Sequence, residues 1–246
     1  MNEGLIAHET AHQWFGDAVT EREWSHVWLS EGFATYFAAL FVEHAHGESA
    51  FHESMRRMRS TVLDDRESVP THPVIDTAQK NLLDLLDRNS YEKGGFVLHM
   101  LRRQVGDSAF FGALRAYYTA HRDGTALSDD LRLAMERASG QQLEWFFDQW
   151  LRRPGFVEAD VTWSYDPSSH QVSLDVAQGG GYGAFRFPLT VAVREGNGVV
   201  RRETITVPAE RQAHLVLPAR FATTPQGLEA DPDVDLLARL DVHSNR

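Results

Sequence analysis

The chain has 246 residues, 42% hydrophobic and 11% aromatic, which is enough apolar material for a folded core and excludes wholesale disorder. Its 24 basic and 35 acidic residues give a net charge of −11, which argues against a general nucleic-acid binder. Its apolar runs are too short for a transmembrane segment. The absence of cysteine excludes disulfides, cysteine nucleophiles and thiolate metal sites, so any metal site must use histidines and carboxylates.

From the start to about residue 155, apolar residues recur three and four positions apart, which is the period of α-helices. One such helix is expected to begin at Ser128 as its N-cap and to stop at Gly140. Another should end near Arg153-Pro154-Gly155, because proline and glycine together do not continue a helix.

After residue 155 the apolar period changes to two, which is typical of strands. Turn-forming segments separate these short alternating runs, the pattern of a small antiparallel β-sandwich of roughly 90 residues. We therefore predict an α+β protein with a helical subdomain over residues 1–155 and a β-sandwich domain over residues 156–246. The strands are expected around Val161, Trp163 and Tyr165; Val172, Leu174 and Val176; and Phe185, Phe187, Leu189, Val191 and Val193.

A segment from about Asp64 to Ser90 lacks a regular apolar pattern and contains Pro70 and Pro73. Long loops inside compact domains are uncommon and are often functional or mobile. This loop delivers the chain to Tyr91. The pair His72-Pro73 lies within it, and the sequence assigns no chemistry to that pair.

The segment His8-Glu9-Thr10-Ala11-His12 has the pattern of a metal site on a helix. Histidines four residues apart lie on one helix face, so both imidazoles can bind one ion, with Glu9 beside it. Two solvated histidines on a helix are the alternative interpretation. Glu31 favours the metal site, because it lies in an apolar segment where a carboxylate is costly to desolvate unless it is paired or binds a cation. Two histidines, one carboxylate and an open fourth position form a known catalytic zinc arrangement.

These residues resemble the aminopeptidase N family of zinc metallopeptidases, peptidase family M1, which belongs to the gluzincins. The likeness rests on His-Glu-x-x-His, eighteen further residues and a glutamate within Trp28-Leu29-Ser30-Glu31-Gly32-Phe33-Ala34. It extends to His12-Gln13-Trp14-Phe15-Gly16-Asp17 and to Tyr91-Glu92-Lys93-Gly94-Gly95, which is similar to the catalytic tyrosine segment of the family. Thermolysin-type peptidases share the first motif but have aspartate where this chain has Thr35.

The resemblance implies one zinc ion (Zn²⁺) held by His8, His12 and Glu31, in the C-terminal part of a catalytic domain. It implies that a zinc-activated water hydrolyses the N-terminal bond of peptide substrates. Glu9 would be the general base, and Tyr91 would donate its phenolic hydrogen to the oxyanion. Without the resemblance, Tyr91 would be an ordinary core tyrosine at the start of a helix.

The resemblance also implies a Gly-x-Met-Glu-Asn segment that binds the substrate amine, and this sequence does not contain it. We therefore expect a fragment of a longer enzyme that contacts the N-terminal domains of its parent. The alternative function is a zinc-binding but catalytically incomplete domain that acts as a scaffold or interaction module. The epoxide-opening activity of one relative is not distinguished by these residues.

Overall fold

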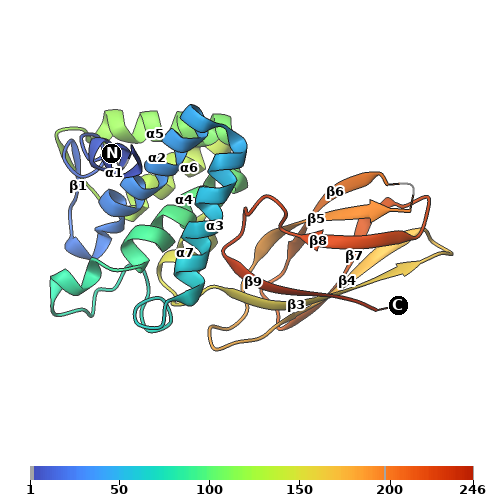
Figure 1. The fold of residues 1–246 in the computed structure, drawn as a ribbon. Coiled ribbons are helices and arrows are strands. Elements are labelled where there is room, and N and C mark those ends of the chain that lie inside the picture. Colours follow the sequence, from blue (N-terminus) through green and yellow to red (C-terminus); the bar gives the residue numbers. More distant parts are fainter. Residues whose placement is uncertain (1–2, 197, 246) are drawn as a thin grey trace. The chain divides into compact units, whose positions relative to one another are not determined.

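The computed structural model describes residues 3–196 and 198–245, which form two compact units, Met1–Gly155 and Phe156–Arg246 (Figure 1). Each unit has its own core, and each is described by itself. The first is mainly helical and the second is made of strands. The α+β fold class predicted from the change of apolar period is confirmed.

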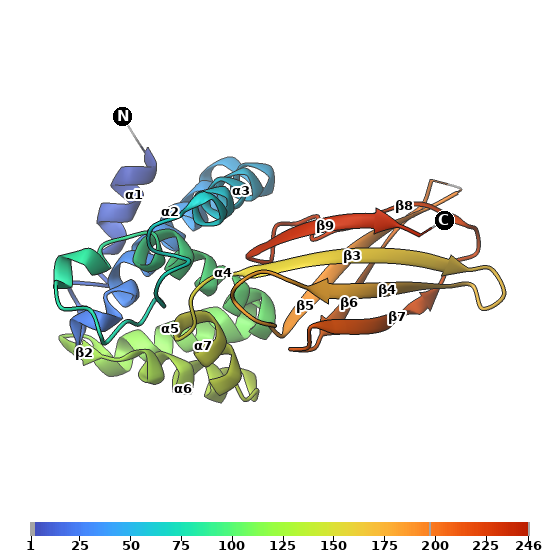
Figure 2. The same ribbon diagram turned by 90° about the horizontal axis from the view of Figure 1, so that it is seen from below.

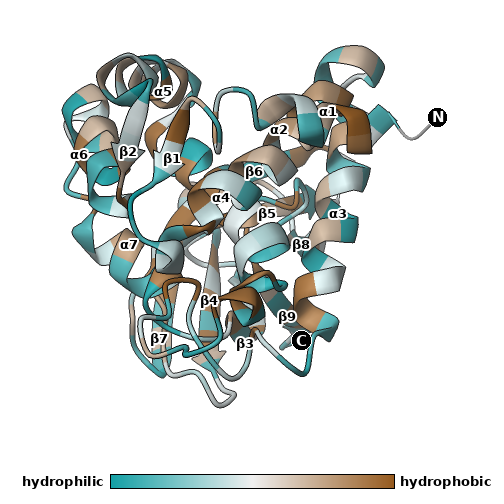
Figure 3. Cartoon of the chain, turned by 90° about the vertical axis from the view of Figure 1, so that its left-hand side faces the viewer, coloured by the Kyte–Doolittle hydropathy of each residue, from teal (hydrophilic) through white to brown (hydrophobic). Residues whose placement is uncertain are grey.

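The first unit contains α-helices joined by short irregular elements. This unit also contains a two-stranded parallel sheet, in which β1 pairs with β2. Figure 3 shows these two strands next to each other. The elements in chain order are α1 (Glu3–Ala11), β1 (Val19–Glu21), the 3₁₀ turn η1 (Trp24–His26), α2 (Trp28–His46), α3 (Glu48–Asp64), the 3₁₀ turn η2 (Leu82–Leu85), the π-helical turn η3 (Asn89–Lys93), α4 (Gly94–Val105), α5 (Asp107–His121), β2 (Gly124–Ala126), α6 (Ser128–Ser139) and α7 (Glu144–Leu151).

Helix α2 is central to this unit because it packs against α1, α3, α4 and η3. Its first half is apolar on nearly every side, the pattern of a helix enclosed by others. Trp28, Phe33 and Tyr36 are fully buried in this core. Helices α2 and α4 cross with their backbones in contact, since an added Cβ at Gly32 would lie 2.9 Å from the carbonyl carbon of Gly94.

The loop expected between Asp64 and Ser90 is present, and its one regular element is the short turn η2. It is anchored to the core at two points. The amide of Ile75 donates to the carbonyl of Leu151 at 2.9 Å, and the amide of Gly155 donates to the carbonyl of Val69 at 2.8 Å. The loop is therefore fixed to the C-terminal end of the helical unit and leads directly into η3.

The second unit consists of two sheets, with strand orders β7-β4-β3-β9 and β6-β5-β8, and Figure 2 shows the first of these. Alternate residues of β3, β4 and β5 are buried, as the apolar period of two predicts. The prediction of an antiparallel sandwich is wrong for one pair, because β9 runs parallel to β3. The strands are β3 (Val157–Asp166), β4 (Gln171–Gln178), β5 (Phe187–Glu195), β6 (Val200–Val207), β7 (Gln212–Arg220), β8 (Pro225–Ala230) and β9 (Ala238–Ser244).

Among the described residues, none of the helices combines the length and the apolar character needed to cross a bilayer. The longest, α2, has 19 residues and carries charged and polar side chains in its second half.

Candidate metal centre

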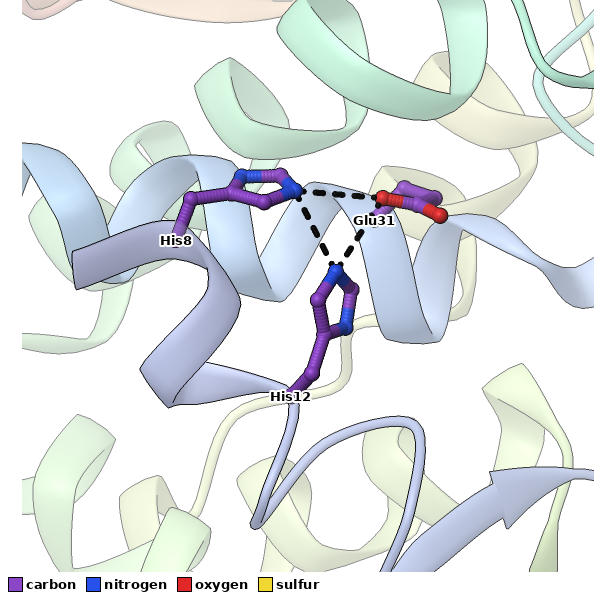
Figure 4. Close-up of side chains that lie close together, drawn as sticks. All are labelled: His8, His12 and Glu31. Carbon is purple, nitrogen blue, oxygen red and sulfur yellow. Dashed lines mark hydrogen bonds and ion pairs between the residues drawn. The ribbon is translucent and has the colours of Figure 1, made fainter. Parts of the chain in front are cut away.

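His8 on α1, His12 directly after the last residue of α1 and Glu31 on α2 lie together (Figure 4). The Nε2 atoms of His8 and His12 lie 3.2 Å apart, and the Oε2 atom of Glu31 lies 3.3 Å from the first and 3.4 Å from the second. Within residues 3–196 and 198–245, this is the one group of three or more such side chains that could converge on a metal ion.

The triangle of ligand atoms has the dimensions of one face of a zinc tetrahedron. Zinc binds imidazole nitrogen and carboxylate oxygen at about 2.0–2.2 Å, so neighbouring ligands of a tetrahedral ion are about 3.3–3.6 Å apart. The observed separations of 3.2–3.4 Å agree with this geometry. Two imidazoles and a carboxylate also match zinc in chemistry, so the residues present fit the metal.

The ring of His12 is oriented by groups on its far side. Its Nδ1 atom lies 3.2 Å from the carbonyl oxygen of Phe15 and 3.2 Å from the hydroxyl of Ser30. An Nδ1–H that donates to this carbonyl leaves the Nε2 lone pair directed at the other two ligands, which is the usual arrangement of a metal-binding histidine.

Gly16 is required where the chain passes beside His12. Its φ is +125°, and an added Cβ would lie 2.5 Å from the Ser30 hydroxyl and 3.0 Å from His12 Nδ1. Any side chain here would displace the groups that orient the imidazole. The steric constraint therefore explains why the residue at position 16, after the histidine motif, is glycine.

The carboxylate of Glu31 is partly buried, and burial by itself raises its pKa. The hydrogen bond with His8 and the charge of His12 outweigh burial, and the hydrogen bond with Tyr91 acts in the same direction, so the pKa is lowered overall. Glu31 is therefore held in the charged form that a cation site needs.

Tyr91 in η3 lies beside the cluster, in contact with His8 and Glu31. Its ring stacks on that of His8, with centroids 6.1 Å apart and planes 10° apart. Burial, followed by the nearby carboxylate of Glu31, raises the pKa of Tyr91 to about 12, and Glu9 contributes in the same direction. The phenol therefore keeps its proton at neutral pH and can act as a donor.

Glu9 is exposed at the surface of α1, directly after His8. The structure thus brings all five predicted residues to one place: His8, His12 and Glu31 as a triangle, with Tyr91 and Glu9 beside it. Ser30 and the Phe15 carbonyl, which orient His12, were missed, because nothing in the sequence indicates contacts that depend on how α2 packs against the loop after α1.

Known proteins are similar to this chain in sequence, mainly over its helical unit, and in fold. The model of the Peptidase family M1 domain matches residues 1–150. The tricorn protease-interacting factor F2 of Thermoplasma acidophilum is 31% identical over 80% of this chain and 26% of its own length. Aminopeptidase N of Lactococcus lactis subsp. lactis is 33% identical over 64% of this chain and 19% of its own length.

Among solved structures, aminopeptidase A of Legionella pneumophila in complex with aspartic acid matches 99% of this chain with a TM-score of 0.78, at 22% sequence identity and over 27% of its own length. This likeness shows a shared fold. The chain thus spans about a quarter or less of the relatives it matches. Because the family model covers more than half of its residues, and both histidines and Glu31 lie within that part, the chain belongs to peptidase family M1.

Proposed function

We propose that the chain carries the metal site of a zinc-dependent aminopeptidase and hydrolyses N-terminal peptide bonds, as part of a longer enzyme. The observation that carries the proposal is the triangle of His8, His12 and Glu31, whose edges of 3.2–3.4 Å fit one tetrahedral ion. Family membership and the aminopeptidases among the relatives support the same reaction class.

Each residue has a defined task in this proposal. His8, His12 and Glu31 would hold the ion, which when bound would polarise the scissile carbonyl and activate a water molecule. The carboxylate of Glu9, exposed beside His8, would accept a proton from the attacking water and pass it to the leaving amine. The protonated phenol of Tyr91 would donate a hydrogen bond to the carbonyl oxygen as negative charge develops on it.

The test is hydrolysis of unblocked aminoacyl arylamides by the purified, zinc-loaded chain. We expect turnover that a chelator abolishes and that added zinc restores. Glu9→Gln should retain zinc and lose turnover, because the amide cannot accept the proton. Turnover that survives both the chelator and Glu9→Gln would contradict the proposal.

The alternative is a zinc-binding domain that is catalytically incomplete and serves as a scaffold or interaction module. The observation that favours it concerns Glu136 on α6, in the segment of this sequence most similar to Gly-x-Met-Glu-Asn. The carboxylate of Glu136 accepts the amide of Leu143 at 2.8 Å and pairs with Arg132, so it is engaged within the helical unit. Stoichiometric zinc without any turnover would support this alternative.

We also propose that the helical unit contacts N-terminal domains of its parent enzyme through an apolar groove of about 810 Å³ between α1, α2 and α5. The side chains of Trp14, Ile6 and Phe41 are exposed at this groove. Figure 3 shows apolar stretches along α1 and α2. Phe41→Glu should lower the thermal stability of the full-length enzyme more than that of this chain alone, and equal losses would contradict the contact.

A further inference from the structure

The π-helical turn η3, which carries Tyr91, is held at its start by one carboxylate. The Oδ1 atom of Asp87 accepts the amide of Asn89 at 2.8 Å and the amide of Ser90 at 3.2 Å. The main-chain carbonyl of Asp87 accepts the amide of Tyr91 itself at 3.1 Å. Asp87 therefore binds three consecutive amides, the last of which belongs to Tyr91.

The second carboxylate oxygen of Asp87 depends on His72. This Oδ2 atom is buried and, within the described part of the chain, makes no hydrogen bond of good geometry. Its charge partner is the imidazole of His72, whose Nε2 atom lies 3.0 Å away. The side-chain amide of Asn89 donates to the main-chain carbonyl of His72 at 3.1 Å, so the loop and the turn are joined twice.

The ionised form of Asp87 is disfavoured by burial, so it depends on the groups that stabilise its charge. Burial raises the pKa of this carboxyl, whereas the amide of Ser90 and the charge of His72 lower it, and the net effect is a raised pKa. A buried carboxylate that loses one of its few partners costs free energy or moves to recover one. Movement of Asp87 would shift the amides bound to it, including that of Tyr91.

The far end of the turn is held by Lys93, which also feels the charge of Asp87. The side-chain nitrogen of Lys93 is buried and donates to the main-chain carbonyl of Arg153 at 3.2 Å. A π-helical turn packs and hydrogen-bonds less regularly than an α-helix and is common at functional sites. Contacts at both ends therefore fix the position of the phenol between them, and only the contact at the start runs through an ionisable side chain of the loop.

We propose that His72, through its ion pair with Asp87, is a positioning residue for Tyr91. The inference rests on the proposed function for the role of Tyr91, while the geometry from His72 to Asp87 and on to the amide of Tyr91 stands by itself. It also gives a task to the pair His72-Pro73, for which the sequence offered none. The imidazole of His72 pairs with Asp87 at 3.0 Å and with Asp76 at 3.9 Å, and it acts on Tyr91 through the first of these.

The test compares His72→Leu, which removes the partner of Asp87, with His72→Gln, whose side-chain amide can place an N–H beside the Oδ2 atom of Asp87. His44→Leu on the exposed end of α2 is the matched control. The first readout is the fluorine spectrum of zinc-loaded protein labelled with 3-fluorotyrosine. The chain has six tyrosines, and Tyr91→Phe identifies the line of interest.

We expect His72→Leu to shift or broaden the Tyr91 line while the other five stay in place, and His72→Gln to restore it. Where turnover is measured, His72→Leu should lower kcat by about 10- to 100-fold with little change in KM, because a misplacement of about 1 Å has effects of this size. His72→Gln should recover most of the loss.

The inference is overturned if the Tyr91 line does not respond to His72→Leu, or if all the tyrosine lines change together, which would indicate a general loss of structure. Should His72→Leu not fold, Asp87→Asn replaces it. This variant keeps the oxygen that accepts the amides and removes the charge that faces His72, and the same selective response of Tyr91 is required. The spectrum can be recorded without turnover. A selective response of Tyr91 in an inactive chain would therefore support the positioning role of His72, and the lack of turnover would contradict only the proposed function.

Discussion

The crossing of α2 and α4 decides how close Glu31 lies to Tyr91, and Gly32→Ala perturbs this crossing directly. An added Cβ at Gly32 would lie 2.9 Å from the carbonyl carbon of Gly94 and 3.2 Å from the amide nitrogen of Gly95. Favourable contacts between such atoms are about 3.5–4.0 Å long. Because both atoms belong to the backbone, no side-chain rotation relieves the overlap, and the helices must separate by about half an ångström or more.

The expected effect is the balance of two terms. Overpacking at a close contact costs about 1–3 kcal/mol. Alanine gains about 0.5–1 kcal/mol over glycine in a helix interior. We therefore expect Gly32→Ala to lower the free energy of unfolding of the helical unit by up to about 2.5 kcal/mol, with a central value of about 1 kcal/mol. Its matched control is Gly112→Ala in α5, where an added Cβ meets nothing within 4 Å, so that only the helix-forming gain remains.

The assay is unfolding by denaturant, followed by tryptophan fluorescence. Five of the six tryptophans lie in the helical unit, so the signal reports mainly on its unfolding. Gly32→Ala should shift the midpoint to lower denaturant and Gly112→Ala to higher denaturant, with zinc affinity reduced in the first alone. If Gly32→Ala is as stable as Gly112→Ala, the reasoning from backbone contact at this crossing is refuted.

Three further outcomes are expected. Gly16→Ala should weaken zinc retention at least tenfold, because its Cβ would lie 2.5 Å from the Ser30 hydroxyl and displace the groups that orient the metal-facing imidazole; unchanged affinity by titration would contradict this. Glu31→Gln should weaken zinc retention as well, since the neutral amide is a poorer ligand, and equilibrium dialysis measures it; affinity equal to wild type would exclude Glu31 as a ligand. Burial lowers the pKa of Lys93 to about 7 from an ordinary value of 10.5. Between these pH values Lys93 is protonated in the unfolded chain but not in the folded one, so the free energy of unfolding should rise with pH from about 7 to 10.5, relative to that of Lys93→Met. Parallel stability curves for the two proteins over that range would show that Lys93 does not titrate in this way.

Local features of the fold could be predicted from the sequence. Helical and strand periods depend on neighbouring residues, and Gly140 does end α6 in a left-handed conformation with φ of 69°. The prediction that Ser128 is the N-cap of that helix is wrong, because the N-cap is Leu127. Ser128 occupies the first turn, and its hydroxyl accepts a hydrogen bond from the indole of Trp28 at 2.8 Å. The partner is a hundred residues away, so no local pattern could indicate it.

Non-local features could not be derived in the same way. The spacing of His8 and His12 predicts that they share a helix face. That Glu31 belongs beside them was inferred from its apolar surroundings and from the family resemblance, and no local pattern gives the distance, which the geometry now shows. The parallel pairing of β9 with β3 and the contact of His72 with Asp87 each join segments whose spacing has no sequence signal. These contacts depend on how the elements pack, which the apolar pattern of any single element does not specify.

The central claim is that His8, His12 and Glu31 form one zinc site. Its most direct test is the zinc content of the purified chain after saturation and removal of free metal, compared with that of the double variant His8→Ala, His12→Ala. We expect one zinc per chain in the first protein and none in the second. Stoichiometric zinc in a folded double variant would place the metal elsewhere and contradict the site.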